Sequence, residues 1–532
     1  MSRAPTKGPA PATSSGGSRS FARRRQRERQ REAMRQASGG LRKSPITLRG
    51  MLRRVPTAAW VCALVALLNA TAWSIIVPPF QGRDEVDHYA YVEQLVEGGT
   101  LPHEPEGFYS YSPGESHVME ALHYAEVRFT PFTPSISTAA QQAALESAAS
   151  SGASLESNGT AGGASSAPPL YYALETIPYS LGAGNPLVQL QLMRLLSVLL
   201  GAITAMLIFF FLREALPAVP WAATVGALCV ALQPQFASTT ASVNPDALMF
   251  ALSAATFLCL ARGFRRRLTP WLAVALGLAT AAGLLTYYSY IGIALGAVGA
   301  VVVLAIRDAR SRGRQALVAP AIAIGIGLSP GILDALAKAG SGKHSFGPAS
   351  SVAGTLGFSS LWHEISYIWE MYLPRLPGMT HYFAGISTWR EIWFDRFVGL
   401  YGWMDTMFPN WVENVALILA LPVALLCARE LILRRQSIRA RMPELAGYAI
   451  VALGLLAMLG LSSYSSDAVK HEDALGEPRY VLPLLPLFAA AIVLAIRGGG
   501  RRFMPVVGVA MLMLFLGHDL FSQLQAIGRY YG

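Results

Sequence analysis

The chain has 532 residues, of which 53% are hydrophobic and 14% charged, and its mean hydropathy is +0.38. This composition excludes an ordinary soluble globular domain, in which about a quarter of the residues are charged. The formal net charge of +11 does not indicate nucleic-acid binding, because Lys and Arg are concentrated in one N-terminal block and in short connectors between apolar runs. We therefore predict a membrane protein that is embedded in the lipid bilayer. We predict no nucleic-acid partner.

The N-terminal segment, residues 1–50, differs in composition from the rest of the chain. It is rich in Arg, Ser, Gly, Pro and Gln and holds almost no aliphatic residues. Such a segment cannot bury enough apolar surface to offset its chain entropy. The composition predicts a disordered basic tail, followed by a transmembrane domain over residues 51–532.

Long apolar runs recur through the remainder of the sequence. A helix that crosses a bilayer needs roughly 20 consecutive, mostly apolar residues. About eleven segments meet this requirement, which predicts an all-α, polytopic transmembrane fold. The predicted spans are 57–78, 186–212, 219–238, 245–262, 270–288, 290–306, 317–336, 412–433, 445–463, 479–497 and 503–522.

The connectors between these runs indicate an orientation. Alternate connectors, those beginning at Arg213, Arg262, Arg307, Arg429 and Arg497, hold far more Lys and Arg than Asp and Glu. By the positive-inside rule these connectors are cytoplasmic. We therefore predict a multi-pass protein of the plasma membrane, with a cytoplasmic N-terminus and an extracytoplasmic C-terminus.

Three predicted external segments are too long to be turns: residues 79–185, 338–411 and 464–478. Loops of this length are usually functional or disordered. Within the first, residues 135–167 are mostly Ala, Ser and Gly, which predicts a flexible insert. The flanks of that insert are dense in Tyr, His, Pro and acidic residues, which predicts helices lying at the membrane interface.

A cluster of titratable residues follows the first span. Apolar residues recur at three- to four-residue steps after Asp84, which predicts an amphipathic helix over 85–97 at the membrane surface. Asp84, Glu85 and His88 would share one face of that helix. The helix N-terminus stabilises a carboxylate, which stays ionised and able to accept a proton. The alternative is that Asp84 is only an N-cap and that the acidic residues after it face solvent.

Other polar residues lie at the predicted outer ends of the spans. Arg194 lies inside the second span, where an isolated arginine costs roughly 2.5 kcal/mol or more and so needs a partner or a ligand. Asn244 and Asp246 begin the fourth span, and Arg479 and Tyr480 begin the tenth. The inner halves of the spans are apolar, which favours a protein that works at one interface.

The order of these motifs resembles that of the GT-C superfamily of membrane glycosyltransferases, and most closely a bacterial polytopic membrane family without an assigned function. The resemblance covers residues 78–486. Two departures are the extra residues between Pro79 and Asp84, and Ala167 where relatives often have His. The motifs are Asp84-Glu85 with His88, Pro168-Pro169-Leu170-Tyr171-Tyr172, Arg194, Ser242-Val243-Asn244-Pro245-Asp246, Gly402-Trp403-Met404-Asp405 with Pro409, and Arg479-Tyr480-Val481-Leu482-Pro483.

The resemblance implies a GT-C-like fold with a large first external loop, and transfer of a sugar from a polyprenyl-phosphate donor, usually with inversion. The acceptor would be an envelope glycan, a glycolipid or a protein. Asp84 would be the catalytic base, with Glu85 as the alternative. Arg194 and Arg479 would bind the phosphate, because guanidinium binds it bidentately and stays charged when buried.

The remaining candidates would contact substrate. His88 would orient the acidic pair or touch phosphate, and the other candidates are Asn244, Asp246, Tyr171, Tyr172, Tyr480, Trp403 and Asp405. No cofactor is required by this chemistry, although a divalent metal held by Asp84, Glu85 and His88 is an alternative. Two other functions stay open: a transporter or flippase for lipid or polysaccharide, and a non-catalytic envelope assembly protein. The sequence has no internal repeat and no midplane polar group of the kind that transporters use.

Overall fold

In the computed structural model, the described residues are 55–103, 110–128, 130, 134, 138–157, 159–341, 361–383, 385, 387–465 and 476–532. The predicted basic tail, residues 1–50, lies outside the described residues, so its disorder stays a prediction. Residues 57–532 form one compact unit.

Within the described part of the chain, nine helices are long and apolar enough to cross a membrane. The all-α, polytopic fold is therefore confirmed. The long helices are α3 (Thr57–Ile76), α9 (Pro186–Ala215), α12 (Asp246–Arg265), α14 (Tyr290–Arg312), α15 (Val318–Ser341, after the 3-10 turn η1, Gly313–Leu317), α20 (Asn410–Leu433), α22 (Met442–Tyr464), α23 (Leu485–Gly498, after the 3-10 turn η5, Pro478–Leu484) and α24 (Gly500–Tyr531).

Two predicted spans are shorter than expected. The apolar run 219–238 is broken into α10 (Pro220–Ala231) and α11 (Pro234–Thr240), because Pro234 cannot continue a helix. The side chain of Gln233 caps α11 by accepting a hydrogen bond from the backbone N–H of Phe236. The run 270–288 forms α13 (Pro270–Leu284), which a short turn separates from α14. The break in the first run leaves α11 as a short polar helix at the end of the bundle.

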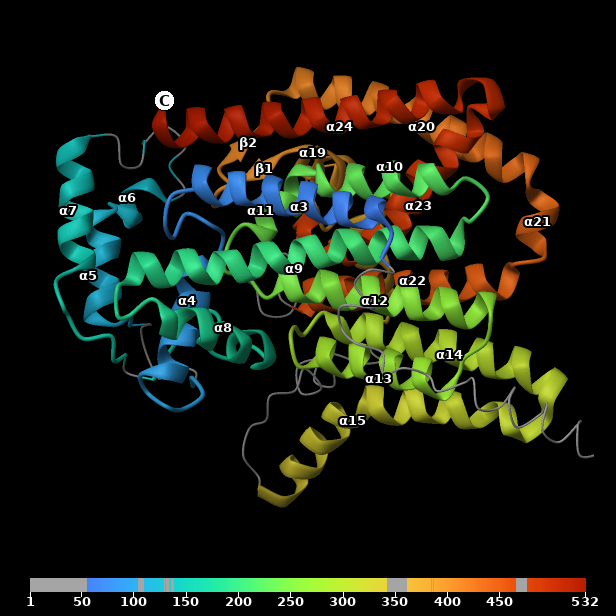
Figure 1. Cartoon of the computed structure of the whole chain (residues 1–532), viewed down its shortest axis with the longest axis horizontal. Coiled ribbons are helices and arrows are strands. Elements are labelled where there is room, and N and C mark those ends of the chain that lie inside the picture. The colour runs from blue at the N-terminus through green and yellow to red at the C-terminus, as the bar shows by residue number, and fades with distance from the viewer. Residues whose placement is uncertain are drawn as a thin grey trace, which may run out of the picture. The chain divides into compact units, whose positions relative to one another are not determined.

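The spans pack as neighbouring helices. Figure 1 shows α3, α9, α10 and α12 running side by side, and α14 packs along α22. Glycines permit this second contact: a Cβ atom added to Gly292 of α14 would lie 2.4 Å from the carbonyl oxygen of Gly454 in α22. Small residues at such crossings let helix backbones approach closely in membranes.

The described residues of the first long loop, 79–185, form helices gathered at one end of the bundle (Figure 1). The predicted amphipathic surface helix is α4, but its residues from Glu85 to Gln94 are buried, with only Asp87 partly exposed. The reason is aromatic packing, since Tyr91 of α4 stacks on Tyr172 of α8 with ring centroids 3.7 Å apart. The helices are α4 (Glu85–Val96), α5 (Pro113–Ala121), α6 (Tyr124–Val127), α7 (Ala139–Ala149) and α8 (Leu170–Leu181).

The described part of the low-complexity segment 135–167 contains the helix α7, while the flexibility of this insert stays a prediction. Thr138 and Gln141 form a capping box at the start of α7, and Ala is the best helix former. Ala161 and Ala164 are buried, and Gly162 lies directly against the Asp87 side chain of α4. Small residues in this segment therefore serve close packing.

The second long loop, residues 338–411, is described over 338–341, where α15 ends, and over 361–383, 385 and 387–411. Its last part is a two-stranded antiparallel hairpin in which Leu400 pairs with Met407. The turn of this hairpin, Gly402 to Asp405, reaches the same end of the bundle as α11. The elements are α17 (Leu361–Tyr372), α18 (Thr388–Arg390), the π-helical turn η3 (Glu391–Asp395), α19 (Arg396–Val398), β1 (Leu400–Tyr401) and β2 (Thr406–Met407), with α21 (Arg435–Arg439) in a later connector.

The predicted orientation gives a labelling test. A cysteine introduced at Gly152, in the first long loop, is expected to react with a membrane-impermeant thiol reagent added to intact cells. A cysteine at Gln436, in a basic connector, is expected to react only after the cells are permeabilised. Both positions are exposed in the structure, so accessibility from each side decides the result. The reverse pattern would overturn the orientation.

Candidate functional site

The loop between α3 and α4 carries Asp84 in an unusual backbone conformation. Asp84 has φ 55° and makes no side-chain cap bond to α4. Its Oδ2 instead accepts a hydrogen bond from Arg479 Nη2 at 2.7 Å. A non-glycine residue in this region of backbone space is uncommon and is often found at functional sites. Asp84 therefore occupies the N-cap position of α4, but its side chain binds Arg479 and does not cap the helix.

Arg194 and Glu85 form a buried ion pair beneath this loop. The two guanidinium–carboxylate hydrogen bonds measure 2.7 and 2.5 Å, and both side chains are at most 2% exposed. The remaining Arg194 N–H groups donate to the carbonyl oxygens of Ser74, Val77 and Pro78 at 2.8–2.9 Å. All five guanidinium donors are thus used within the protein.

This pairing corrects two predicted roles. Arg194 has no N–H group left for a phosphate, and it holds the loop after α3 in place. Glu85 Oε2 is bound to Arg194, and its Oε1 accepts from both Arg194 and the backbone N–H of Val243. Glu85 is therefore unsuited to act as the base. The partner that a buried arginine requires is, for Arg194, a residue of the protein, Glu85.

Arg479 lies at the centre of a second, more open ionic network. Besides Asp84, its guanidinium contacts Glu477 at 2.9 Å and Asp246 at 3.8 Å. Arg83 pairs with Glu477 and lies 3.6 Å from Asp84. In contrast with Arg194, the Nη1 atoms of Arg83 and Arg479 make no hydrogen bond to any described residue. These two guanidinium groups retain donors for a ligand.

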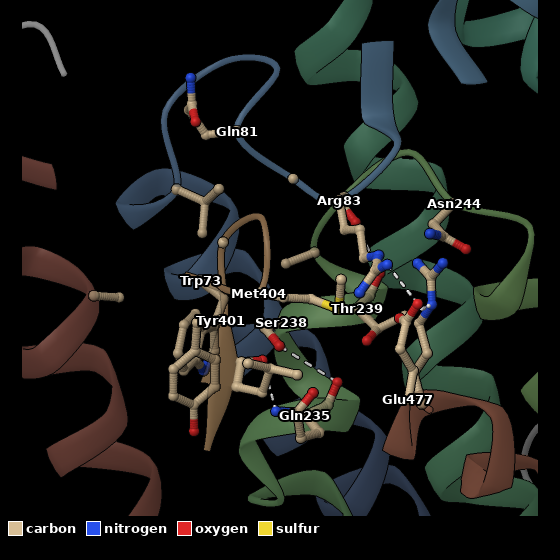
Figure 2. Close-up of a pocket in the computed structure, with 18 of the residues that line it drawn as sticks. Trp73, Gln81, Arg83, Gln235, Ser238, Thr239, Asn244, Tyr401, Met404 and Glu477 are labelled. Atoms are coloured by element: carbon tan, nitrogen blue, oxygen red, sulfur yellow. Dashed lines mark hydrogen bonds and ion pairs between the residues drawn. The ribbon is translucent and has the colours of Figure 1, made fainter. Parts of the chain in front are cut away.

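A pocket of about 690 Å³, counting its open mouth, adjoins this network. Arg83, Glu477 and Arg479 line one end, and the rest is lined by residues of α3 and the loop after it, of α11 and the residues that follow it, of the β1–β2 hairpin and of α24. Figure 2 shows Arg83 and Glu477 facing each other across this end of the pocket. Gly82 permits the tight loop here, because a Cβ atom on it would lie 2.7 Å from Ser242 Cβ.

The titratable groups of the loop have shifted pKa values. Burial raises the pKa of Asp84, but Arg479 and Arg83 lower it more, so that it falls to about 2. Burial lowers the pKa of His88 to about 4, although nearby Asp84 opposes that shift. His88 Nδ1 lies 3.0 Å from the Tyr172 hydroxyl. At neutral pH the site therefore contains an ionised Asp84 and a neutral His88.

The structure brings together some of the other predicted substrate-binding residues. Asn244 lines the pocket, and Asp246 is fully buried beside Arg479. The Tyr480 ring lies 5.2 Å from the Arg479 guanidinium. These residues lie around the ionic network, and their contact with substrate stays a prediction.

Four other predicted residues do not line the pocket. Tyr171 and Tyr172 are fully buried between α4, α8 and α9, where Tyr171 bonds the Ser197 hydroxyl at 2.7 Å. In the hairpin turn, Asp405 pairs with Arg529 at 2.7 Å, and the Trp403 ring lies 3.9 Å from the Arg128 guanidinium. These contacts fix the loops that surround the pocket. None of the four lines it.

Several pocket residues were not among the sequence candidates: Arg83, Ser238, Thr239, Ser242 and Met404. Arg83 directly precedes Asp84 in the sequence, and this position next to the candidate base could have identified Arg83 as a site residue. Ser238 lies in the apolar run 219–238, which reads as one continuous span until the break before Pro234 is known. Thr239 and Ser242 lie in the connector after that run, and Ser242 belongs to the motif that ends at Asp246, although no role was assigned to it. Met404 belongs to a loop, where periodicity gives no information.

The proposed metal ligands do not converge. Among the described residues, no group of three His, Cys, Asp or Glu side chains is arranged to hold a metal ion. Of the three predicted ligands, Glu85 directs both carboxylate oxygens toward Arg194 and Val243. The residues Asp84, Glu85 and His88 therefore do not fit a shared divalent cation.

The sequence matches the model of one protein family. Residues 56–488 match the family described as "Predicted membrane protein (DUF2142)", and the chain belongs to this family. This supports the coarser expectation of a multi-pass membrane protein. No curated protein matches the sequence significantly.

Weak similarity to solved structures was also found. The oligosaccharyltransferase of Archaeoglobus fulgidus, solved with a tethered acceptor peptide, is 11% identical with a TM-score of 0.43, over 89% of this chain and 55% of that one. ArnT from Cupriavidus metallidurans, bound to undecaprenyl phosphate, is 13% identical with a TM-score of 0.43, over 89% of this chain and 76% of that one. The chain spans about half the length of the archaeal enzyme.

Proposed function

We propose that this protein is a membrane glycosyltransferase that moves a sugar from a polyprenyl-phosphate donor to an acceptor at the predicted external face. The observation that carries the proposal is the contact of one ionised carboxylate, Asp84, with two guanidinium groups, Arg83 and Arg479, which both line the adjoining pocket. Each guanidinium keeps an Nη1 group without a partner among the described residues. Arginine binds phosphate oxygens through such paired donors.

The arrangement suits a single inverting displacement. The acceptor oxygen attacks the anomeric carbon, and its proton passes to the Asp84 carboxylate. The bond between the anomeric carbon and the phosphate oxygen breaks, and the lipid phosphate leaves with the electron pair. Arg83 and Arg479 stabilise the charge that develops on that phosphate.

Binding of the donor would also strengthen the base. In the unliganded site, Arg479 lowers the pKa of Asp84 to about 2, at which a carboxylate is a weak base. A phosphate that takes up the donors of Arg479 competes with Asp84 for the same positive charge. The pKa of Asp84 then rises toward its ordinary value, and the carboxylate accepts a proton more readily.

A membrane-embedded site fits a donor of this kind. The isoprenoid tail is apolar and needs lipid or an apolar groove, whereas the phosphate and sugar need polar groups. The polar network lies at the ends of α12 and of the η5–α23 span, beside the loop that follows α3. The headgroup could therefore reach the site while its tail stays in the bilayer.

Lipid binding tests the proposal. The full chain, purified into lipid nanodiscs, is expected to bind polyprenyl monophosphate, and Arg83→Gln and Arg479→Gln are each expected to weaken binding about tenfold or more, since a charge-assisted hydrogen bond is lost. Arg375→Gln is the matched control, because Arg375 is exposed in the second long loop and distant from the pocket residues in sequence.

The assay has a clear contrary outcome. If wild-type protein binds no polyprenyl phosphate, or if both pocket variants bind as tightly as Arg375→Gln, the proposed site is wrong. Mass spectrometry of envelope glycans and glycolipids with and without the gene then complements the binding assay, because a missing sugar names the acceptor class.

A further inference from the structure

Charge is distributed unevenly around the pocket. The charged side chains that line it, Arg83, Glu477 and Arg479, are all at one end and are paired with one another. Figure 2 shows Trp73 and Tyr401 on the opposite side of the pocket, with Ser238 and Met404 between the two ends. Every other described residue that lines the pocket is neutral.

The neutral wall is a row of hydroxyl groups at the end of α11. Ser238 and Thr239 are partly exposed, and Ser242 follows just after the helix. The Ser238 and Ser242 hydroxyls donate to backbone carbonyl oxygens at 3.4 and 3.1 Å, so their lone pairs remain available as acceptors. Hydroxyl groups of this kind exchange hydrogen bonds with the hydroxyls of a sugar.

This wall is held rigidly against the hairpin. The Gln235 amide donates to the carbonyl oxygens of Leu400 and Arg396 at 2.7 and 3.1 Å, which ties α11 to β1 and α19. A binding surface whose supporting residues are fixed in this way is preorganised for its ligand.

Met404 forms the facing side. It has φ 62°, a strained conformation for a non-glycine residue, and its side chain is 39% exposed (Figure 2). The turn around it is fixed by the Asp405–Arg529 ion pair and by the packing of Trp403 on Arg128. Strain of this kind persists where the surrounding structure maintains it, commonly at functional sites. Here the strained turn presents an uncharged, apolar side chain to the pocket.

Building on the proposed function, we propose that the transferred sugar is uncharged, and that it binds between the hydroxyls of Ser238, Thr239 and Ser242 and the side chain of Met404. An amino or carboxyl substituent on the sugar would lie against a wall that supplies no opposite charge. An ionised group buried without a partner is costly. The nearby acids Glu477 and Asp84 are already paired with arginines.

A donor series tests this inference on the full chain in nanodiscs. The ligands are polyprenyl monophosphate alone and the same carrier linked to a neutral hexose, to an amino-deoxy sugar and to a uronic acid. We expect the neutral-sugar lipid to bind more tightly than the bare carrier. The two charged-sugar lipids are expected to bind at least about tenfold less tightly than the neutral one. A factor of ten in Kd corresponds to about 1.4 kcal/mol of binding free energy.

A charge introduced into the wall provides the second measurement. Thr239→Asp is expected to reverse the preference toward the amino sugar, because it supplies the carboxylate that the wall lacks. Thr239→Asn, which has nearly the same shape without the charge, is expected to keep the neutral preference. Thermal unfolding of both variants establishes that they fold.

The outcomes separate this inference from the proposed function. If the bare carrier and all three donors fail to bind, both are overturned. If the bare carrier binds but a charged-sugar lipid binds as tightly as the neutral one, only the uncharged-sugar inference is overturned. Equal preferences in Thr239→Asp and Thr239→Asn would also overturn it, since the wall would then not contact the sugar.

Discussion

Replacing Arg194 with alanine is expected to destabilise the folded chain by about 3–5 kcal/mol, the range observed when one partner of a buried ion pair is removed. The change leaves Glu85 charged and fully buried, and it removes the donors to the carbonyl oxygens of Ser74, Val77 and Pro78. Thermal unfolding of the detergent-solubilised protein measures the effect, and a lowered yield in the membrane accompanies it.

A matched ion pair provides the control for this experiment. Arg266 also binds a glutamate, Glu214, through two hydrogen bonds of 3.0 and 2.9 Å, but its side chain is 73% exposed. Arg266→Ala is therefore expected to cost about 0–1 kcal/mol. If Arg194→Ala unfolds at the wild-type temperature, the buried pair does not support the loop that carries Asp84.

For Arg194, the sequence predicts the need for a partner but does not identify that partner. A buried arginine in a predicted span requires a partner, and the sequence alone cannot say whether that partner is a ligand or a residue 109 positions away. Asp84 and Arg479 do lie together, and both were predicted to lie at the outer membrane interface. The spans themselves are predictable because each depends only on a local run of apolar residues.

Loop geometry accounts for what the sequence leaves undetermined. Arg83 and Met404 lie in loops, where no periodicity indicates which way a side chain points. The break between α10 and α11 depends on Pro234, yet hydropathy reads through it as one span. The segment around α7 has the composition of a linker, but small residues also allow close packing, and Gly162 lies against Asp87. Composition alone does not separate these two uses.

Asp84→Asn is expected to lower sugar transfer about 10²- to 10⁴-fold, the usual contribution of a general base. Its effect on folding is expected to be small, because the Asp84 side chain is 33% exposed and Arg479 keeps its contact with Glu477. The assay is transfer of labelled sugar from a polyprenyl-phosphate donor in membranes, with thermal unfolding measured in parallel. Glu120→Gln, in the exposed part of α5, is the control and is expected to retain full activity.

The pH dependence of the same assay identifies the base. The pKa of Asp84 is about 2 in the unliganded site, so this carboxylate is ionised at all higher pH values. Bound phosphate raises that pKa toward the ordinary value of about 4, and transfer is therefore expected to stay constant from pH 8 to about pH 5 and to fall below that. His88, with a pKa of about 4, is neutral over the same range and contributes no step. Loss of transfer near pH 6–7 in the wild type, or full activity in Asp84→Asn, would assign the proton transfer to another residue.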